Sequence, residues 1–289
     1  MFAFALLAAA AILLNLISGA VVTDTLSIGG SGAVSALDGP SAAFSIFSVA
    51  GHRLLSEIAG TLVVLLAAWV TFADKRSRVK IIAWVGVALV ALEAWMGMMT
   101  RPYHASKFVP TAADGSGFFH ALVAQILFVL VVHIVVYEWP GWEKESKPVM
   151  DKGWPSLRGL SNSTVGALML QVALGAAFRH NLLSVLWHIL CAFVVVIFGL
   201  GMLVLITQVP ENRFLRVPVI WLGSLLGVQV SLGMVLISIS DPAKHAMVSA
   251  ITVASHVATG ATCLGLGVLT SMLIRRGSKA ALAEVSVEG

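Results

Sequence analysis

Long apolar runs alternate with short polar stretches along the whole chain. A helix needs ~20 apolar residues to cross a bilayer, and eight runs reach or approach that length. Backbone polar groups in a membrane must be hydrogen-bonded within the protein, so runs this long are predicted to be helices. The pattern therefore predicts an all-α, polytopic membrane protein with eight transmembrane helices. They are expected near residues 2–22, 45–72, 81–99, 116–138, 162–178, 182–207, 218–239 and 247–274.

The composition agrees with a membrane location. Of the 289 residues, 58% are hydrophobic and only 11% are charged, and the mean hydropathy is +0.96, far from the values of soluble domains. The first run has no basic residues before it and is longer than the core of a signal peptide, so we interpret it as a transmembrane helix. Cys191 and Cys263 fall inside apolar runs and are expected to be small core residues rather than a disulfide.

Basic residues gather on one side of the predicted membrane. Of the 18 Lys and Arg residues, 13 lie in alternate connections and in the C-terminal tail, and cytoplasmic loops carry such an excess. Both termini are therefore predicted to face the cytoplasm from a cell inner (plasma) membrane, with the lipid bilayer as partner. The net charge of +4 is divided among short clusters and does not indicate nucleic-acid binding. The clustered residues are Lys75, Arg76, Arg78, Lys80, Lys144, Lys147, Lys152, Arg158, Arg213, Arg216, Arg275, Arg276 and Lys279.

Four histidines recur at one interval: His52, His120, His188 and His256 each follow the previous one by 68 residues. Each lies near the predicted outer end of an even-numbered span, where a buried polar side chain marks a candidate functional site. Within each half of the chain the two imidazoles are expected to face each other, as the axial ligands of a six-coordinate haem iron do. A lone membrane histidine more often hydrogen-bonds another helix, but four at one interval and depth favour ligation. A dinuclear copper or zinc site is a weaker alternative, because no Asp, Glu or Cys cluster adds ligands at that depth.

The odd-numbered spans share a second repeat, in which a polar residue precedes a glycine by four positions. This spacing places both residues on one helix face. Glycine allows another helix, or a flat macrocycle, to approach the backbone closely, so the glycines are candidate cofactor contacts. Ordinary helix packing is the simpler alternative. The four pairs are Asn15 with Gly19, Glu93 with Gly97, Gln171 with Gly175, and Gln229 with Gly233.

The two repeats together predict two similar four-helix bundles in tandem. The N-terminal bundle is expected over residues 1–139 and the C-terminal bundle over residues 162–275. A cytoplasmic linker at 140–161, containing Trp142 and other interface-forming residues, and a cytoplasmic tail at 276–289 complete the predicted organisation.

Charged residues near the histidines are further candidates. Arg53 lies inside a span and needs an anionic partner, which a haem carboxylate, Asp24 or Asp38 could provide. Arg179 could hold a haem carboxylate, although a solvated position in an outer loop explains it equally well. The same two alternatives apply to its neighbours in the predicted outer loops, which are Arg101, His104, His180, Lys244 and His245.

Two carboxylates lie inside the first predicted bundle. Glu57 follows His52 by five residues and is therefore rotated ~140° from it around the helix, so it is expected to face away from a bound iron. Glu93 could carry protons, or it could be a hydrogen-bonded packing residue, which is the interpretation we favour slightly. His133 has no partner histidine at its predicted depth and is interpreted as structural.

These features resemble the haem A synthase family, whose members are eight-helix membrane enzymes made of two bundles with a His pair near the outer surface of each. The resemblance implies that haem O, the substrate, binds between His52 and His120, and haem b between His188 and His256. It also implies oxidation of a methyl group of haem O to a formyl group, giving haem A, and candidate partners in haem O synthase, a terminal oxidase or another membrane complex. The matching positions are Ser18-Gly19-Ala20-Val21-Val22-Thr23, Gly51-His52-Arg53, Leu92-Glu93-Ala94 with Gly97, His120, Gly175 with Arg179-His180, His188, Gln229 with Gly233, and His256.

The chain departs from the family pattern in three ways. The family's catalytic glutamate lies three residues before the first histidine, where this chain has Val49. A valine can neither accept a proton nor stabilise a cation, so the candidate substitutes are Asp24, Asp38 and Glu57. The outer-loop cysteine pair of many bacterial members is absent, and the usually long fifth loop is reduced to a few residues around His180.

Two main hypotheses follow from the sequence. The first is an enzyme that oxidises haem O. The second keeps the fold without the activity, as a bis-His membrane cytochrome or a haem-carrying accessory subunit of a respiratory or photosynthetic complex. A transporter is a third and weaker hypothesis, because the polar residues gather near one surface rather than at the middle of the membrane.

Overall fold

The computed structural model describes residues 1–38, 46–99, 115–142, 148–149, 154–207, 213–239, 241–242 and 244–288, without the side chains of 26–38, 99 and 279–288. The described residues form eight helices and no strand, and every helix is long and apolar enough to cross a membrane. The predicted all-α, multi-pass class is therefore confirmed. The helices are α1 (Phe2–Asp38), α2 (Val49–Ala73), α3 (Ser77–Met99), α5 (Gly115–Glu138), α6 (Leu157–Arg179), α7 (Val185–Ile206), α8 (Arg213–Ser238) and α9 (Ala246–Glu288).

Several helices continue beyond the apolar runs that predicted them. Helix α1 extends to Asp38 rather than ending near residue 22, and α9 extends to Glu288, through most of the predicted tail. Polar side chains remain compatible with a helix when they bond to its own backbone, as the Thr23 hydroxyl does by donating to the carbonyl of Gly19 at 2.8 Å. Helix α6 begins at Leu157, inside the predicted linker, because the Ser156 hydroxyl caps its first turn.

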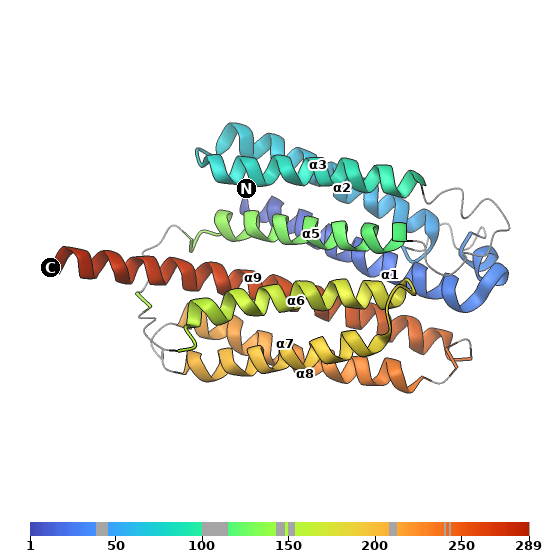
Figure 1. Cartoon of the computed structure of the whole chain (residues 1–289). Helices are drawn as coiled ribbons and strands as arrows, with labels where there is room; N and C mark the ends of the chain where they lie inside the picture. Colours follow the sequence, from blue (N-terminus) through green and yellow to red (C-terminus); the bar gives the residue numbers. More distant parts are fainter. Residues whose placement is uncertain are drawn as a thin grey trace.

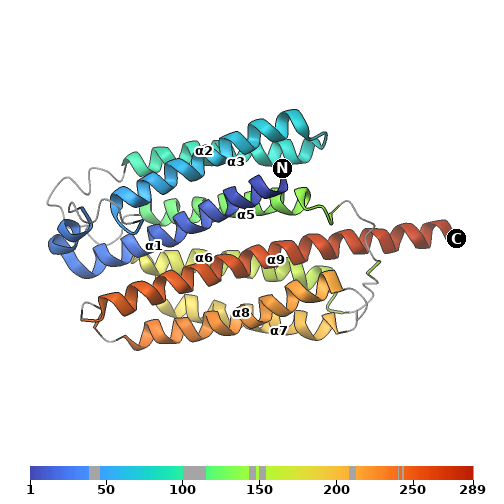
Figure 2. The same cartoon turned by 180° about the vertical axis from the view of Figure 1, so that it is seen from behind.

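The helices are arranged as two four-helix bundles that lie side by side (Figure 1). Helices α1, α2, α3 and α5 pack as one bundle, and α6, α7, α8 and α9 pack as the other. The bundles meet where α1 packs on α9 and where α5 packs on α6 and α9. Both termini lie at the same end of the assembly, and α9 extends beyond the other helices there (Figure 2). We call this the terminal end, and the opposite end, where α2, α5, α7 and α9 begin, the histidine end.

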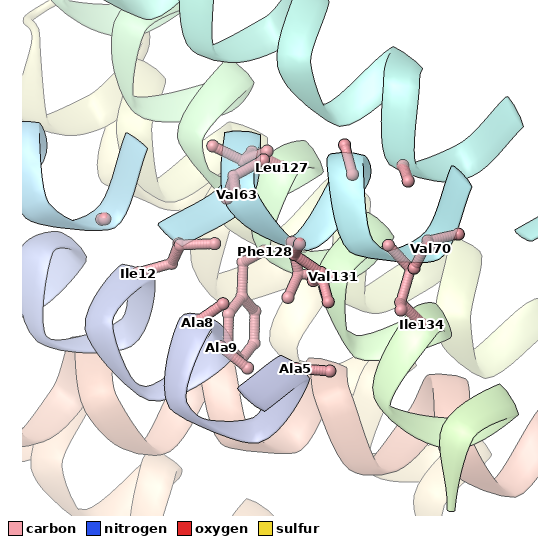
Figure 3. Close-up of a cluster of buried hydrophobic side chains, with 14 of the residues drawn as sticks. Ala5, Ala8, Ala9, Ile12, Val63, Val70, Leu127, Phe128, Val131 and Ile134 are labelled. Atoms are coloured by element: carbon pink, nitrogen blue, oxygen red, sulfur yellow. The ribbon is translucent and has the colours of Figure 1, made fainter. Parts of the chain in front are cut away.

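The core of the first bundle forms where small side chains of α1 let it approach α2 and α5. Ala5 and Ala8 are fully buried there against apolar side chains of both helices (Figure 3). Ala261 of α9 belongs to the same cluster, so the core continues into the contact between the bundles. Close packing of this kind stabilises membrane helices, because lipid provides no hydrophobic drive for them to associate. The other residues labelled in Figure 3 are Ala9, Ile12, Val63, Val70, Leu127, Phe128, Val131 and Ile134.

The second bundle has its own buried clusters and an apolar outer surface. Cys191 and Cys263 are buried in one cluster with Leu226 and Leu264 and form no disulfide, as expected for small core residues. On α7, exposed apolar side chains follow one another at helical spacing and form a stripe that faces outward. Such a stripe is suited to contact with lipid. Its members are Phe193, Ile197, Leu200 and Val204.

An ion-pair network fixes the turn between α2 and α3 at the terminal end. The Arg76 Nη2 atom lies 2.8 Å from Asp74 Oδ2 and 2.6 Å from Glu138 Oε1, and Nη1 donates to the carbonyl of Tyr137 at 2.9 Å. Burial alone would raise the pKa of Asp74, but the hydrogen bonds from Arg76 outweigh burial and hold the pKa of this carboxyl below its ordinary value. The network connects the start of α3 to the end of α5.

Candidate functional site

Each of the four histidines lies near the start of its helix, at the histidine end. Ser48 caps α2, and its hydroxyl accepts a hydrogen bond from the Gly51 amide at 2.9 Å. The His52 amide donates to the Ser48 carbonyl at 2.8 Å, so His52 belongs to the first turn after the cap. Ser184 caps α7 in the same way and places His188 one turn into that helix. His120 and His256 lie within the first three turns of α5 and α9.

The structure brings together both pairs of histidines that the sequence repeat predicts. The ring centres of His52 and His120 are 6.4 Å apart, with 86° between the ring planes. Those of His188 and His256 are 6.3 Å apart, with 60° between the planes. One pair belongs to each bundle, formed by α2 with α5 and by α7 with α9. Across the parts of the chain that the structure describes, no group of three or more His, Cys, Asp or Glu side chains gathers to form a metal centre.

The distance between the two rings of each pair matches the separation of two imidazoles that bind one haem iron. An imidazole nitrogen binds a metal at about 2 Å, and the ring centre lies about 1 Å further back, so two axial imidazoles have ring centres about 6 Å apart. Both observed separations agree with that value. Two imidazoles that bind one iron need not be coplanar, so the interplanar angles do not exclude that both rings of a pair would hold a haem iron.

Three of the four repeated glycines support a histidine ring directly. A Cβ atom on Gly19 would lie 2.9 Å from Cε1 of His52, and one on Gly175 would lie 2.9 Å from Cε1 of His188. At Gly233 the corresponding distance to Cε1 of His256 is 3.4 Å. At Gly97 a Cβ would have no described atom within 4 Å. These three glycines leave room for imidazoles on the neighbouring helix, and the contact of the four glycines with a cofactor stays a prediction.

In the second bundle, the polar residues of the repeat hold the histidines. The Gln171 side-chain amide donates to His188 Nε2 at 3.2 Å, and His188 Nδ1 donates to the Gln171 carbonyl at 3.1 Å. The Gln229 amide likewise donates to His256 Nε2 at 3.1 Å. This pattern assigns the proton to Nδ1 and a lone pair to Nε2. A neutral imidazole with a lone pair on Nε2 is the form that binds a metal.

In the first bundle the corresponding contact is made by a carboxylate. The Oε2 atom of Glu93 lies 2.6 Å from His120 Nδ1, at ion-pair distance although without the alignment of a hydrogen bond. The Glu93 side chain is 15% exposed and that of His120 is 32% exposed. Asn15 of α1 contacts α2 through Ser56, whose hydroxyl donates to Asn15 Oδ1 at 3.0 Å. The recurrence of a polar residue before each histidine was visible in the sequence, but its contact with the imidazole was not predicted.

Arg179 and Asp24 form an ion pair that connects the two bundles. The Nη2 atom of Arg179, at the end of α6, lies 3.0 Å from Asp24 Oδ1 and donates to the Ala20 carbonyl of α1 at 3.1 Å. The Ser249 hydroxyl of α9 donates to Asp24 Oδ2 at 3.0 Å. Beside this link, a Cβ on Gly117 would lie 2.3 Å from His180 Cε1. The end of α6 therefore packs tightly into the first bundle. The role of Arg179 toward a haem carboxylate stays a prediction.

The remaining candidates include residues on α2 and residues outside the described part of the chain. Arg53 and Glu57 are exposed on α2, and for Glu57 this agrees with its expected rotation away from His52. Val49, at the position of the family's glutamate, is buried. The side chain of Asp38 lies outside the described residues, as do Arg101 and His104. His133 Nδ1 donates to the backbone carbonyl of Val129 on its own helix at 2.8 Å, in keeping with a structural role.

Fold and site together define a polytopic membrane protein with a facing histidine pair in each of two four-helix bundles. A comparison with family models adds the family. The model of the cytochrome oxidase assembly protein family, COX15-CtaA, matches residues 43–188, just over half of the chain, and includes His52, His120 and His188. The chain therefore belongs to this family, which is the haem A synthase family and is associated with cytochrome oxidase assembly and haem A synthesis. No curated protein matches the chain.

Proposed function

We propose that this protein oxidises the methyl group of haem O to a formyl group, with haem O as the substrate in the first bundle and haem b resident in the second. Water supplies the oxygen atom, and the four electrons and four protons released pass to an electron acceptor outside the chain and to solvent. The observation that carries the proposal is the ring-centre distance of 6.4 Å and 6.3 Å in the two histidine pairs, the separation that axial ligands of one iron require. Membership of the haem A synthase family supports the choice of haem O as substrate.

The residues of the chain have separate tasks in this proposal. His52 and His120 would hold the substrate, and His188 and His256 the haem b, whose iron supplies one-electron chemistry when it is bound. Gly19 leaves space for the His52 ring to face the partner helix. Glu93 contacts the His120 ring, and the Gln171 and Gln229 amides contact the His188 and His256 rings, so side chains of neighbouring helices orient three of the four imidazoles.

A non-catalytic bis-His cytochrome is the second candidate, and one observation favours it. Val49 occupies the position of the family's glutamate and is buried, so no carboxylate acts from there. Of the proposed substitutes, Glu57 is exposed and Asp24 is engaged by Arg179 and Ser249. Such a protein would still bind two haems and exchange electrons.

Haem analysis separates the two candidates. The full-length protein is purified from cells that also make haem O, and its haems are extracted and separated by chromatography. Haem A beside haem b supports the enzyme, whereas haem b alone with haem O supplied supports the cytochrome. His188→Ala or His256→Ala should each remove the haem b, and His133→Ala is the matched control that should remove none. Full haem content in both pair variants would refute haem ligation by these residues.

A further inference from the structure

The two histidine pairs are held by chemically different partners. On α6 and α8 the repeated polar residue is a glutamine, and on α1 it is an asparagine, so three of the four positions have neutral amides. Only α3 has a carboxylate at this position, Glu93, and that carboxylate contacts His120. The difference is not a matter of side-chain size, because glutamate and glutamine have nearly the same shape.

The carboxylate and the amides also meet different ring nitrogens. In the second bundle the Gln171 and Gln229 amides occupy Nε2, the lone pair that a metal would take, so these amides must give way on ligation. Glu93 instead meets Nδ1 of His120. The carboxylate therefore lies at the nitrogen opposite Nε2, 2.6 Å away, and this contact is compatible with ligation of a metal through Nε2.

A carboxylate beside the non-ligating nitrogen of an imidazole changes the electronic properties of the metal that the imidazole binds. It fixes the tautomer and orientation of the ring and makes the imidazole a stronger donor. Stronger donation and nearby negative charge both stabilise ferric over ferrous haem, and hydrogen bonding around the axial ligand is one of the main controls of haem potential. The Glu93 side chain is mostly buried, so solvent and salt screen its charge weakly.

We propose that Glu93 is a positioning residue for His120 and that it lowers the reduction potential of the first-pair haem relative to the second. The inference rests on haem binding at the first pair, which is part of the proposed function, but not on the oxidation of haem O. Through it, the substrate site becomes the more easily oxidised of the two, and electrons leaving the first bundle have a downhill path toward the second.

The test is a spectroelectrochemical titration of the full-length, haem-loaded protein. The component of the first pair is identified by its absence in His120→Ala. In Glu93→Gln, which gives α3 the same side chain as α6 and α8, we expect this component to shift to higher potential. We expect at least a tenfold change in its ferric–ferrous equilibrium, which corresponds to a shift of about 59 mV or more for one electron. The second component should stay unchanged. Glu57→Gln is the matched control, because it removes a carboxylate from the same bundle that is exposed on α2, and it should shift neither component.

The outcomes keep this inference distinct from the proposed function. Unchanged potentials in Glu93→Gln with both haems bound would overturn the role of Glu93 and leave haem binding intact. Absence of any first-pair haem in the unmodified protein would instead refute the proposed function. If Glu93→Gln loses the first-pair haem, Glu93→Asp decides. If Glu93→Asp keeps the first-pair haem at low potential, this supports the need for a carboxylate. If both variants lose the first-pair haem equally while keeping the second haem, the proposed role of Glu93 is overturned.

Discussion

Replacing Gly19 by alanine tests whether the repeated glycines exist to accommodate the histidine rings. The new Cβ would lie 2.9 Å from Cε1 of His52, whereas carbon atoms in contact are normally about 3.5–4.0 Å apart. The ring must therefore retreat by at least about 0.6 Å, away from the glycine of α1. Overpacking of this kind costs about 1–3 kcal/mol. The better helix propensity of alanine, about 1 kcal/mol, offsets part of this destabilisation.

The cost should appear mainly in haem binding, because an imidazole that has moved no longer matches the axial position. A penalty of 1–3 kcal/mol corresponds to a roughly 5- to 150-fold weaker affinity for the haem of the first pair. Gly175→Ala should have the same effect on the second pair, since its Cβ would also lie 2.9 Å from the histidine ring. Gly233→Ala, at 3.4 Å, should have a smaller effect.

Gly97→Ala is the internal control, because its Cβ would have no described atom within 4 Å. This variant should keep both haems and gain up to about 1 kcal/mol from helix propensity. The assay is haem content per protein after gel filtration, together with the low-spin absorbance of each haem and thermal unfolding in detergent. Equal retention of first-pair haem in Gly19→Ala and Gly97→Ala would refute the steric argument. Equal loss in both would show that glycine serves a purpose other than accommodating the ring.

Two further predictions concern the links at the two ends of the bundles. Arg179→Ala should lower the unfolding temperature, because it removes the guanidinium that pairs with the buried Asp24 carboxylate, at a cost of about 1–3 kcal/mol. A double variant with Asp24→Asn should recover part of that loss, and an unchanged unfolding temperature in Arg179→Ala would contradict the link. At the terminal end, the pKa of Asp74 is held below its ordinary value by Arg76, so its contribution to stability is complete above about pH 3.9 and is lost as the pH falls through the lowered pKa. Thermal unfolding between pH 6 and pH 3 should show less acid destabilisation in Asp74→Asn than in the unmodified protein, and identical slopes would refute the prediction.

The helices could be predicted from the sequence because a membrane imposes a strong and simple requirement. A span must be apolar over about 20 residues and must satisfy its own backbone, so eight runs predicted eight helices. Their ends were less predictable, because a helix continues through polar residues wherever caps or back-bonded hydroxyls satisfy the chain, as at Ser156 and Thr23. An apolar run therefore predicts the part of a helix that lies in lipid, whereas the position of the helix end depends on hydrogen bonds of the terminal backbone groups.

The histidine pairs could also be predicted, because one interval repeated across the chain places equivalent residues at equivalent depths. The link between Arg179 and Asp24 could not, since it joins residues 155 positions apart in different bundles. The sequence predicts different partners for the two residues, a haem carboxylate for Arg179 and Arg53 for Asp24. Contacts between the bundles depend on how α1 packs against α9 and α6, and this packing cannot be predicted from the spacing of residues within one helix.

Because Val49 stands where the family has a glutamate, the sequence suggests substitute carboxylates on the same helix and in the segments before it, namely Glu57, Asp24 and Asp38. A bundle positions chemistry differently, because the residues that surround a ligand come from the helix packed against it. The carboxylate in contact with the first pair comes from α3, through Glu93 and His120. If Glu93 lowers the potential of this site, a protein without the family's glutamate still stabilises positive charge at the first haem through its axial ligand. Val49 therefore removes the expected proton acceptor, but it does not by itself remove the electrostatic asymmetry between the bundles. Haem chromatography and the Glu93→Gln titration measure these two properties separately.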